Sequence, residues 1–253
     1  MGTEIQTRFS RDGVVPCIDA LSSVEISEVR ALIDTLEAQK GKELVQVGLL
    51  GKERECVSIW TAATHPQILD AVEAVIGPNI ILLGTHVFCK YPADDVGQKS
   101  FVAWHQDATY WGLVPPRVVT AWLAVDDVDE ENGAMMVVAG SHKNGFYTHG
   151  KSSMAGNLLS VNQAINETDL DLARVVTISL RAGQISLHDG LAVHGSHPNR
   201  SRRRRCGLTC RFAPPEIQIV PEEDRAHEWQ AVLVRGADPC GNIPLLPPPS
   251  FSF

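Results

Sequence analysis

The sequence has few of the features that mark secreted, membrane-bound or nucleic-acid-binding proteins. It has no apolar run near the ~20 residues that a bilayer-spanning helix needs, and its first residues lack the basic and then apolar pattern of a secretion signal. Its six cysteines are scattered, and no two of them form a Cys-x-x-Cys pair. We therefore expect a soluble, cytoplasmic protein whose reduced thiols act as small buried apolar side chains.

Positive charge is also scarce. The 22 lysines and arginines are outnumbered by 30 aspartates and glutamates, which leaves a formal net charge of -8. Such a chain is a poor candidate for nucleic-acid binding, because phosphate contacts need a basic surface. The exception is the run of four arginines at 202–205, which could be a nucleic-acid or import patch. We favour a solvated turn that ends in one functional arginine, Arg205, and expect a small molecule as the partner, with no nucleic acid and no membrane.

The first third of the chain is typical of helices. Ser22 and Glu25 form a capping-box pattern ahead of apolar residues at helical spacing, and Gly41 ends that run. A second helix is expected to begin at His65-Pro66, with proline at its first position.

After about residue 79 the pattern changes to short β-rich runs separated by turn signals such as Glu131-Asn132-Gly133. The expected strands lie at 80–83, 118–125, 135–138, 175–180, 184–187 and 207–212. Several short strands without helices between them favour an antiparallel sandwich or jelly roll. Residues 143–174 are polar and weakly patterned, and are expected to form a long loop or lid.

The chain is expected to be one domain, since all-β folds often reach 253 residues undivided. The predicted fold is mainly β with flanking helices. We divide it into a helical N-terminal part at about 1–79, a jelly-roll core at about 80–215 and a C-terminal extension at about 216–253.

The central motif for chemistry is Trp104-His105-Gln106-Asp107. In an extended segment residues i and i+2 point the same way, so His105 and Asp107 can offer an imidazole and a carboxylate to one ion. His194 is the candidate for the third ligand. Two histidines and one carboxylate on one face of an ion leave three positions open, which is the arrangement of Fe(II) oxygenases.

Arg205 follows His194 by eleven residues, across an expected turn at 198–201. That offset suits two neighbouring strands, with Arg205 directed into the cavity that holds the metal. An arginine fork binds a carboxylate with two parallel hydrogen bonds, as the distal carboxylate of 2-oxoglutarate would require.

Three segments together resemble the phytanoyl-CoA dioxygenase family: residues 104–110 (WHQDATY), 131–142 (ENGAMMVVAGSH) and 194–201 (HGSHPNRS). The resemblance covers roughly residues 8–236 and is strongest from 80 to 215. It implies a double-stranded β-helix, Fe(II), 2-oxoglutarate as co-substrate, O₂, and oxidation of an unactivated C–H bond.

The resemblance also implies roles for single residues. His105, Asp107 and His194 match the family's iron ligands. The residues that match its 2-oxoglutarate contacts are Arg205, Ser196, Trp122 and, in a strand that diverges from the family, His86.

Three further residues are candidates for contact with the substrate. Tyr110 and Trp111 follow the metal motif, and core packing is an equal alternative for them. His188 lies six residues before His194, so its side chain can share a face with it; a pocket residue that supports the site is the alternative to a ligand.

The leading functional hypothesis is a 2-oxoglutarate-dependent dioxygenase that hydroxylates a small polar molecule or a biosynthetic intermediate, with release of succinate and CO₂. Desaturation, epoxidation and rearrangement are related outcomes. A halogenase is disfavoured, because Asp107 would occupy the position that such enzymes open for chloride. A hydrolytic or non-catalytic metal-binding β-barrel, for example with zinc, is the alternative from another class, and it would not need Arg205 or Ser196.

Overall fold

The computed structural model describes residues 2–92, 100–152, 155–159, 163–220 and 229–251. Two antiparallel sheets form the core. The larger has seven strands in the order β1-β11-β6-β13-β3-β15, with β2 also paired to β3, and the smaller has the order β10-β7-β12-β4. The strands of the larger sheet are β1 Val14–Asp19, β2 Leu49–Leu50, β3 Ile80–Lys90, β6 Val119–Ala124, β11 Gln184–Asp189, β13 Arg205–Ala213 and β15 Val232–Arg235. Those of the smaller are β4 Val102–His105, β7 Met135–Val138, β10 Val175–Ile178 and β12 His194–Ser196.

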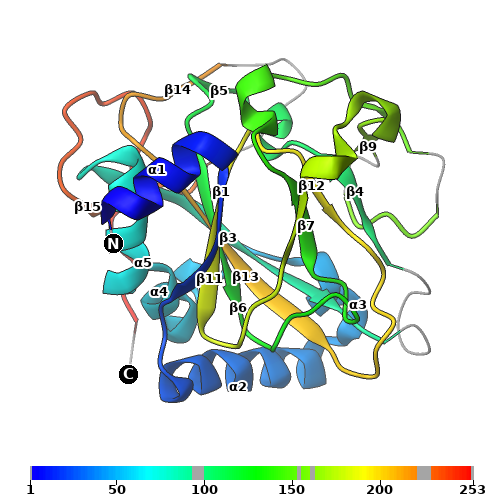
Figure 1. The fold of residues 1–253 in the computed structure, drawn as a ribbon. Coiled ribbons are helices and arrows are strands. Elements are labelled where there is room, and N and C mark those ends of the chain that lie inside the picture. Colours follow the sequence, from blue (N-terminus) through cyan, green and yellow to red (C-terminus); the bar gives the residue numbers. More distant parts are fainter. Residues whose placement is uncertain (1, 93–99, 153–154, 160–162, 221–228, 252–253) are drawn as a thin grey trace.

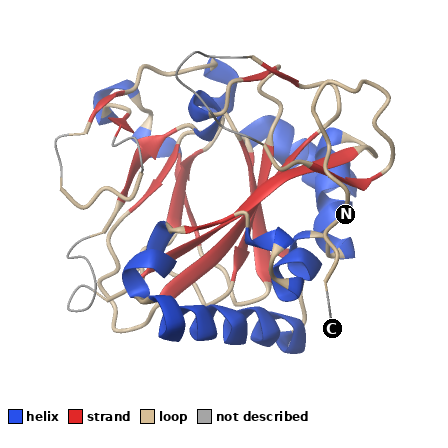
Figure 2. Ribbon diagram, turned by 180° about the vertical axis from the view of Figure 1, so that it is seen from behind, coloured by secondary structure: helices blue, strands red, loops and turns tan. Residues whose placement is uncertain are grey.

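Helices pack on the larger sheet. In Figure 1, α1, α4 and α5 lie to the left of the strands, α2 runs along the bottom, and the smaller sheet stands on the right; Figure 2 shows the same layers from behind. The helices are α1 Gly2–Asp12, α2 Ser23–Lys40, α3 Lys42–Val47, α4 Val57–Ala63 and α5 Pro66–Ile76. Among the residues the structure describes, no helix is both long and apolar enough to span a bilayer.

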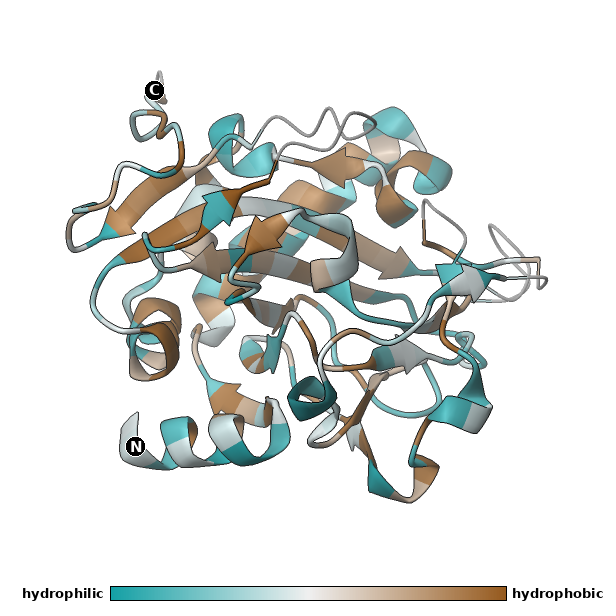
Figure 3. Cartoon of the chain, turned by 90° about the horizontal axis from the view of Figure 1, so that it is seen from above, coloured by the Kyte–Doolittle hydropathy of each residue, from teal (hydrophilic) through white to brown (hydrophobic). Residues whose placement is uncertain are grey.

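The burial pattern follows from this layering. Every residue of β6 is buried, because one face of the strand meets the helices and the other faces the smaller sheet. In Figure 3 the strands are largely brown and the exposed helical turns carry most of the teal. The main core joins apolar residues of the helices to the outer face of the larger sheet.

The two helices expected from capping signals are confirmed. The Ser22 backbone N–H donates to Glu25 Oε2 over 2.8 Å, the Glu25 N–H donates to Ser22 Oγ over 3.4 Å, and α2 ends at Gly41, which has a φ of 85°. Pro66 begins α5. The buried residues of α2 are Ile26, Val29, Ile33 and Leu36.

Some strands differ from the expectation. β3 runs from Ile80 to Lys90, well past the expected 80–83. β1 lies within the part of the chain expected to be helical and pairs with β11, so it extends the larger sheet. Its sequence contains Pro16, a residue that sheets tolerate at an edge, and β1 is an edge strand.

The described part of 143–174 has more structure than a plain loop. It holds the paired strands β8 Gly150–Lys151 and β9 Gln163–Ala164 and 3-10 turns at Glu167–Asp169 and Leu172–Arg174. The buried Ile165 donates its N–H to the carbonyl of Trp104, which attaches the segment to β4 beside the metal motif.

Candidate active site

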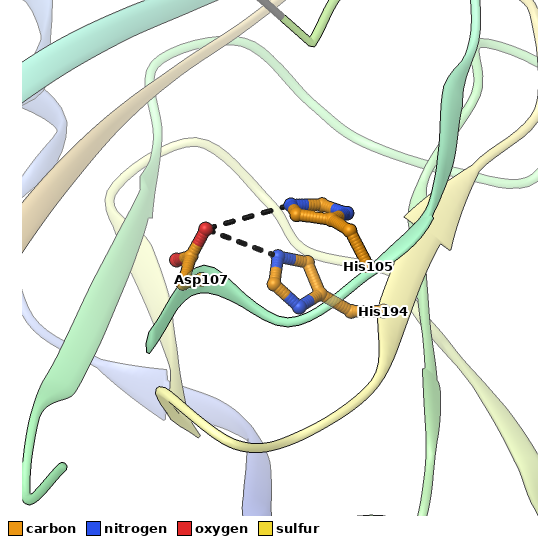
Figure 4. Close-up of side chains that lie close together, drawn as sticks. All are labelled: His105, Asp107 and His194. Atoms are coloured by element: carbon orange, nitrogen blue, oxygen red, sulfur yellow. Dashed lines mark ion pairs between the residues drawn. The ribbon is translucent and has the colours of Figure 1, made fainter. Parts of the chain in front are cut away.

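Three side chains meet where β4 and β12 lie side by side. His105 ends β4 and His194 begins β12, directly opposite it in the register, with ring centroids 4.1 Å apart. Asp107 begins the 3-10 turn Asp107–Tyr110, and its Oδ1 lies 3.4 Å from His105 Nε2 and 3.9 Å from His194 Nε2. Figure 4 shows the carboxylate facing both rings. The three donor atoms lie within 4.8 Å of one another, which suits a shared metal ion.

Backbone carbonyls orient both imidazoles. His105 Nδ1 lies 2.9 Å from the carbonyl oxygen of Ala103, and His194 Nδ1 lies 2.9 Å from that of Ala192. A carbonyl only accepts, so each Nδ1 carries the proton and each Nε2 keeps its lone pair for the shared point. Metal-binding histidines are oriented in this way by partners behind them.

Gln106 keeps the motif extended. Its amide N–H groups donate to the carbonyls of Gly145 and Leu191 over 2.8 and 2.7 Å, and its oxygen accepts from the Tyr147 N–H. Gln106 is thus anchored on the side away from the triad, and its neighbours His105 and Asp107 share the other side.

The ionisation states also suit a metal. Burial alone raises the pKa of Asp107, but the imidazoles of His105, His188 and His194 outweigh it and hold the pKa well below its usual range. Burial lowers the pKa of His194 well below that of a free histidine. The site therefore presents an anionic carboxylate and a neutral imidazole, the forms that bind metal ions.

The triad opens into a cavity of about 410 Å³ between the two sheets. Every site residue named from the sequence lines this cavity: His86, His105, Asp107, Tyr110, Trp111, Trp122, His188, His194, Ser196 and Arg205. Their roles stay predictions, but the fold brings all of them to one space.

Arg205 reaches this cavity from an unexpected direction. Its strand, β13, belongs to the larger sheet, whereas β12 with His194 belongs to the smaller one. The expectation that the two lie on neighbouring strands is therefore wrong. The chain between them crosses from one sheet to the other. Arg205 and His194 therefore line the same cavity from opposite sheets.

Arg205 is a buried cation without a counter-charge. It is 4% exposed, its Nε has no hydrogen-bond partner, and no carboxylate among the described residues forms an ion pair with it. Its guanidinium lies over the ring of Trp122, 4.8 Å from the centroid. Burial lowers the pKa of Arg205 to about 10, so it remains charged at neutral pH. A buried charge of this kind calls for an anionic ligand.

The other arginines of the run differ from one another. Arg203 is exposed and pairs with Asp129 over 2.6 Å. Arg204, expected to lie in a solvated turn, is instead largely covered and pairs with Asp34, Glu37 and Asp126. It attaches α2 to the start of β13, a structural role that the sequence alone did not indicate.

Lys90 is a neighbour of the site that the sequence reasoning missed. It is 1% exposed and lies opposite Arg205 in the register of β3 and β13. Its Nζ donates to the hydroxyl of Ser196 over 2.6 Å and also to the carbonyls of Ser196 and His197. Burial, followed by the charge of Arg205, lowers its pKa well below the usual value. Lys90 lies four residues after His86 on one strand, so the two side chains share a face, and this two-residue period could have identified Lys90 from the sequence.

The remaining predicted residues occupy different parts of the cavity wall. His86 Nε2 lies 2.6 Å from the carbonyl of Val47, and burial, then the charge of Arg211, lowers its pKa to about 4. The Tyr110 hydroxyl is buried without a partner, and burial raises its pKa to about 12.

His188 reaches the site from the larger sheet. Its ring centroid is 4.7 Å from that of His194, and its Nε2 is 3.7 Å from Asp107 Oδ2. Neither ring nitrogen has a hydrogen-bond partner. It lies beside the triad and outside the group of three whose donor atoms converge. Arg211, Trp229, Leu158 and Leu159 also line the cavity and were not expected from the sequence.

Comparison with known proteins agrees with this geometry. The family model described as phytanoyl-CoA dioxygenase (PhyH) matches residues 9–207, which is most of the chain. The chain belongs to the phytanoyl-CoA dioxygenase family. Bovine (Bos taurus) peroxisomal phytanoyl-CoA dioxygenase is 30% identical over 177 residues, covering 69% of this chain and 52% of that protein. The human enzyme is 28% identical over 177 residues. The chain thus spans about half the length of these curated relatives.

Solved structures of the family's fold match over nearly the whole chain. The non-heme monooxygenase ThoJ in its apo form has a TM-score of 0.80 at 28% identity, covering 97% of this chain and 88% of ThoJ. The epimerase SnoN in complex with Fe3+, alpha ketoglutarate and nogalamycin RO has a TM-score of 0.73 at 23% identity, covering 97% of each chain. The predicted jelly roll is confirmed by these matches and by the antiparallel sheets.

Proposed function

We propose that this phytanoyl-CoA dioxygenase family member is an Fe(II)- and 2-oxoglutarate-dependent oxygenase that oxidises a C–H bond of a small molecule. The observation that carries the proposal is the pairing of two features in one cavity. The converging triad His105, Asp107 and His194 suits a divalent metal, and the unpaired buried Arg205 suits a carboxylate. The printed titles of SnoN and ThoJ, an alpha ketoglutarate complex and a non-heme monooxygenase, support it by similarity.

The donor set fits the ion. Two imidazole nitrogens and one carboxylate suit Fe(II) and leave positions open for other ligands. A bound Fe(II) would supply O₂ activation, coupled to oxidative decarboxylation of 2-oxoglutarate to succinate and CO₂. The carbonyls of Ala103 and Ala192 hold the two rings in the ligand orientation.

Two residues suit the distal carboxylate of 2-oxoglutarate. The Arg205 fork would bind it, with the guanidinium over the ring of Trp122. Ser196 Oγ already accepts from Lys90, so its own O–H is available to donate to the same carboxylate. No protein acid or base is needed, and the wall of the cavity would position the substrate and exclude water.

The competing functions explain less of the cavity. A hydrolytic zinc site accounts for the triad but leaves Arg205 buried without a partner. A halogenase needs an open metal position for chloride. Here the Asp107 carboxylate, 3.4 and 3.9 Å from the two imidazoles, would fill that position. We therefore propose oxygen transfer, with hydroxylation as the first outcome to test and a cytoplasmic location, although the bovine and human relatives are named as peroxisomal.

The test has two stages. Anaerobic addition of Fe(II) and then 2-oxoglutarate should produce a weak visible absorption band, which only the metal chelate gives. Release of succinate should then be screened against a metabolite panel in air. His105→Ala is the matched control and should lose both signals. A protein that binds zinc, never gives the band and hydrolyses an ester would contradict the proposal.

A further inference from the structure

Arg211 is a second cation in the same cavity, and nothing in the proposed iron and 2-oxoglutarate chemistry uses it. It lies on β13, six residues beyond Arg205, and lines the cavity. Side chains alternate along a strand, so both arginines and Thr209 between them face the same space. At about 3.3 Å per residue, the two arginine Cα atoms are about 20 Å apart.

Among the residues the structure describes, Arg211 forms no hydrogen bond or ion pair. Its Nε is buried without a partner. Its guanidinium lies 5.5 Å from the ring centroid of Trp111. Glu53, a buried carboxylate on the same part of the sheet, accepts from the N–H and hydroxyl of Thr85 and makes no ion pair with Arg211. The planar face of Arg211 is therefore covered, and its N–H edge keeps its donors for a ligand.

The register places Arg211 on the opposite side of the triad from Arg205. Arg211 lies opposite Thr120 on β6, and Thr120 lies opposite His188 on β11. His188 Nε2 is 3.7 Å from Asp107. Two strand spacings of about 4.8 Å put the Cα atoms of Arg211 and His188 about 10 Å apart. Arg205, in contrast, lies opposite Lys90, at the end of the cavity where Lys90 binds Ser196.

The charges of the loaded site do not balance without another anion. Arg205, Arg211 and a divalent iron bring four positive charges, and Asp107 is the only carboxylate among the described residues that line the cavity. Dianionic 2-oxoglutarate and Asp107 together oppose three of them. One positive charge remains on the side of Arg211, whose side chain is partly buried.

The wall around Arg211 suits an apolar or aromatic body. Trp111 and Trp229 meet edge to face with centroids 6.4 Å apart, and Leu158 and Leu50 also line this cavity. His86, whose pKa lies near 4, is neutral and does not compete for an anion.

We propose that Arg211 is a substrate-binding residue that takes the anionic group, a carboxylate or a phosphate, of a small molecule with an apolar or aromatic body. This assignment rests on the proposed function, because it treats the triad and Arg205 as occupied by iron and 2-oxoglutarate. The anion would hold one end of the substrate at Arg211, so that a C–H bond along its body reaches the triad beside His188.

The test compares each anion with a neutral compound that carries the same phenyl body. Phenylacetate is paired with phenylacetamide, and phenyl phosphate with phenol. Binding is measured anaerobically by calorimetry, with Fe(II) present and 2-oxoglutarate saturating so that Arg205 is occupied. The wild type should bind at least one anion about tenfold or more tightly than its neutral partner, the range for a charge-assisted hydrogen bond. The pair with the larger ratio identifies carboxylate or phosphate as the substrate group.

Variants on the same strand provide the controls. Arg211→Gln should remove the preference for the anion and leave the 2-oxoglutarate absorption titration unchanged, and Arg211→Lys should restore part of the preference. Arg205→Gln should weaken 2-oxoglutarate instead. If both wild-type ratios are near one, or Arg211→Gln keeps the wild-type ratio, Arg211 only supports Trp111 and the inference is wrong. If 2-oxoglutarate binding falls equally in Arg211→Gln, the residue serves the co-substrate and the inference is also wrong.

The outcome for the proposed function is separate. A wild-type protein that prefers the anions, loses that preference in Arg211→Gln, and yet never gives the 2-oxoglutarate absorption band would retain the anion site and refute the oxygenase.

Discussion

Replacing Arg205 tests the central claim that an unpaired buried cation is reserved for 2-oxoglutarate. Arg205→Met keeps much of the side-chain volume over Trp122 while removing the charge. Losing one partner of a buried charge pair costs about 2–5 kcal/mol, which at about 1.4 kcal/mol per tenfold is a rise in Kd of roughly 30-fold to several thousandfold. Arg203→Met is the matched control two residues away. Its ion pair with Asp129 is exposed and is worth about 0–1 kcal/mol to folding.

The same variant has an opposite effect on the ligand-free protein. In the described structure Arg205 has no ion pair to lose, and removing a buried uncompensated charge relieves a desolvation cost. The melting temperature of Arg205→Met without ligand should therefore equal or exceed that of the wild type. Wild-type protein at 2-oxoglutarate concentrations of 100 times Kd should gain about 2.7 kcal/mol, and the variant should gain almost nothing.

Both effects can be read from one experiment. Thermal unfolding is followed anaerobically with Fe(II) over a 2-oxoglutarate titration, for the wild type and the two variants. Equal shifts in Arg205→Met and Arg203→Met would refute the assignment. An Arg205→Met protein that is strongly destabilised without ligand would show that Arg205 has a structural partner, and the reasoning from an unpaired charge would fail.

Four further predictions follow from other parts of the site. His105→Ala and His194→Ala should each abolish succinate release but leave the melting temperature of the apo protein nearly unchanged, because a barrel of this size does not need a metal to fold; retained turnover would contradict the metal assignment. Mass spectrometry of products formed in high chloride should show no halogenated species from the wild type, since the Asp107 carboxylate, 3.4 Å from His105 Nε2, would take the metal position that chloride needs. A chlorinated product would show that Asp107 is no ligand. His86 has a pKa of about 4 in the folded state against an ordinary 6.5, so between these values only the unfolded state binds the proton, and stability falls as pH drops through that window. The free energy of unfolding in urea should fall between pH 7 and pH 5 by about 2 kcal/mol more in the wild type than in His86→Asn. Equal losses would mean that His86 is not the buried neutral group. Lys90→Met and Ser196→Ala should each raise the Kd for 2-oxoglutarate. The Kd of the double variant should equal the larger of the two single-variant values, because Lys90 acts by donating to Ser196 Oγ. Additive losses of binding free energy would give Lys90 an independent role.

The two proposals assign two cavity arginines on one strand to different ligands. β13 crosses the floor of the cavity and presents Arg205 at one end and Arg211 at the other. The triad lies on the facing side, on β4, β12 and the turn that follows β4. This separation allows the affinity for 2-oxoglutarate and for the substrate to be varied by different substitutions, which is the basis of the paired experiments above.

Features that depend on neighbouring residues were predictable from the sequence alone. The capping box of Ser22 and Glu25 acts within one helical turn, and it began α2 as expected. The two-residue period put His105 and Asp107 on one side of an extended segment. Alternation and turn residues also located β6, β7 and β13 to within a few residues.

Contacts between distant segments required the tertiary structure. His194 lies opposite His105 because of the register of β12 with β4, and Arg205 reaches the same cavity from the other sheet. The offset of eleven residues from His194 to Arg205 was consistent with neighbouring strands and with a crossing between sheets, since a local spacing does not specify which strand pairs with which. The lack of a counter-charge for Arg205 and Arg211 is likewise a property of the assembled cavity. Composition shows how many carboxylates the chain has, but only the packing of the two sheets determines that Asp107 alone, among the described lining residues, faces these cations.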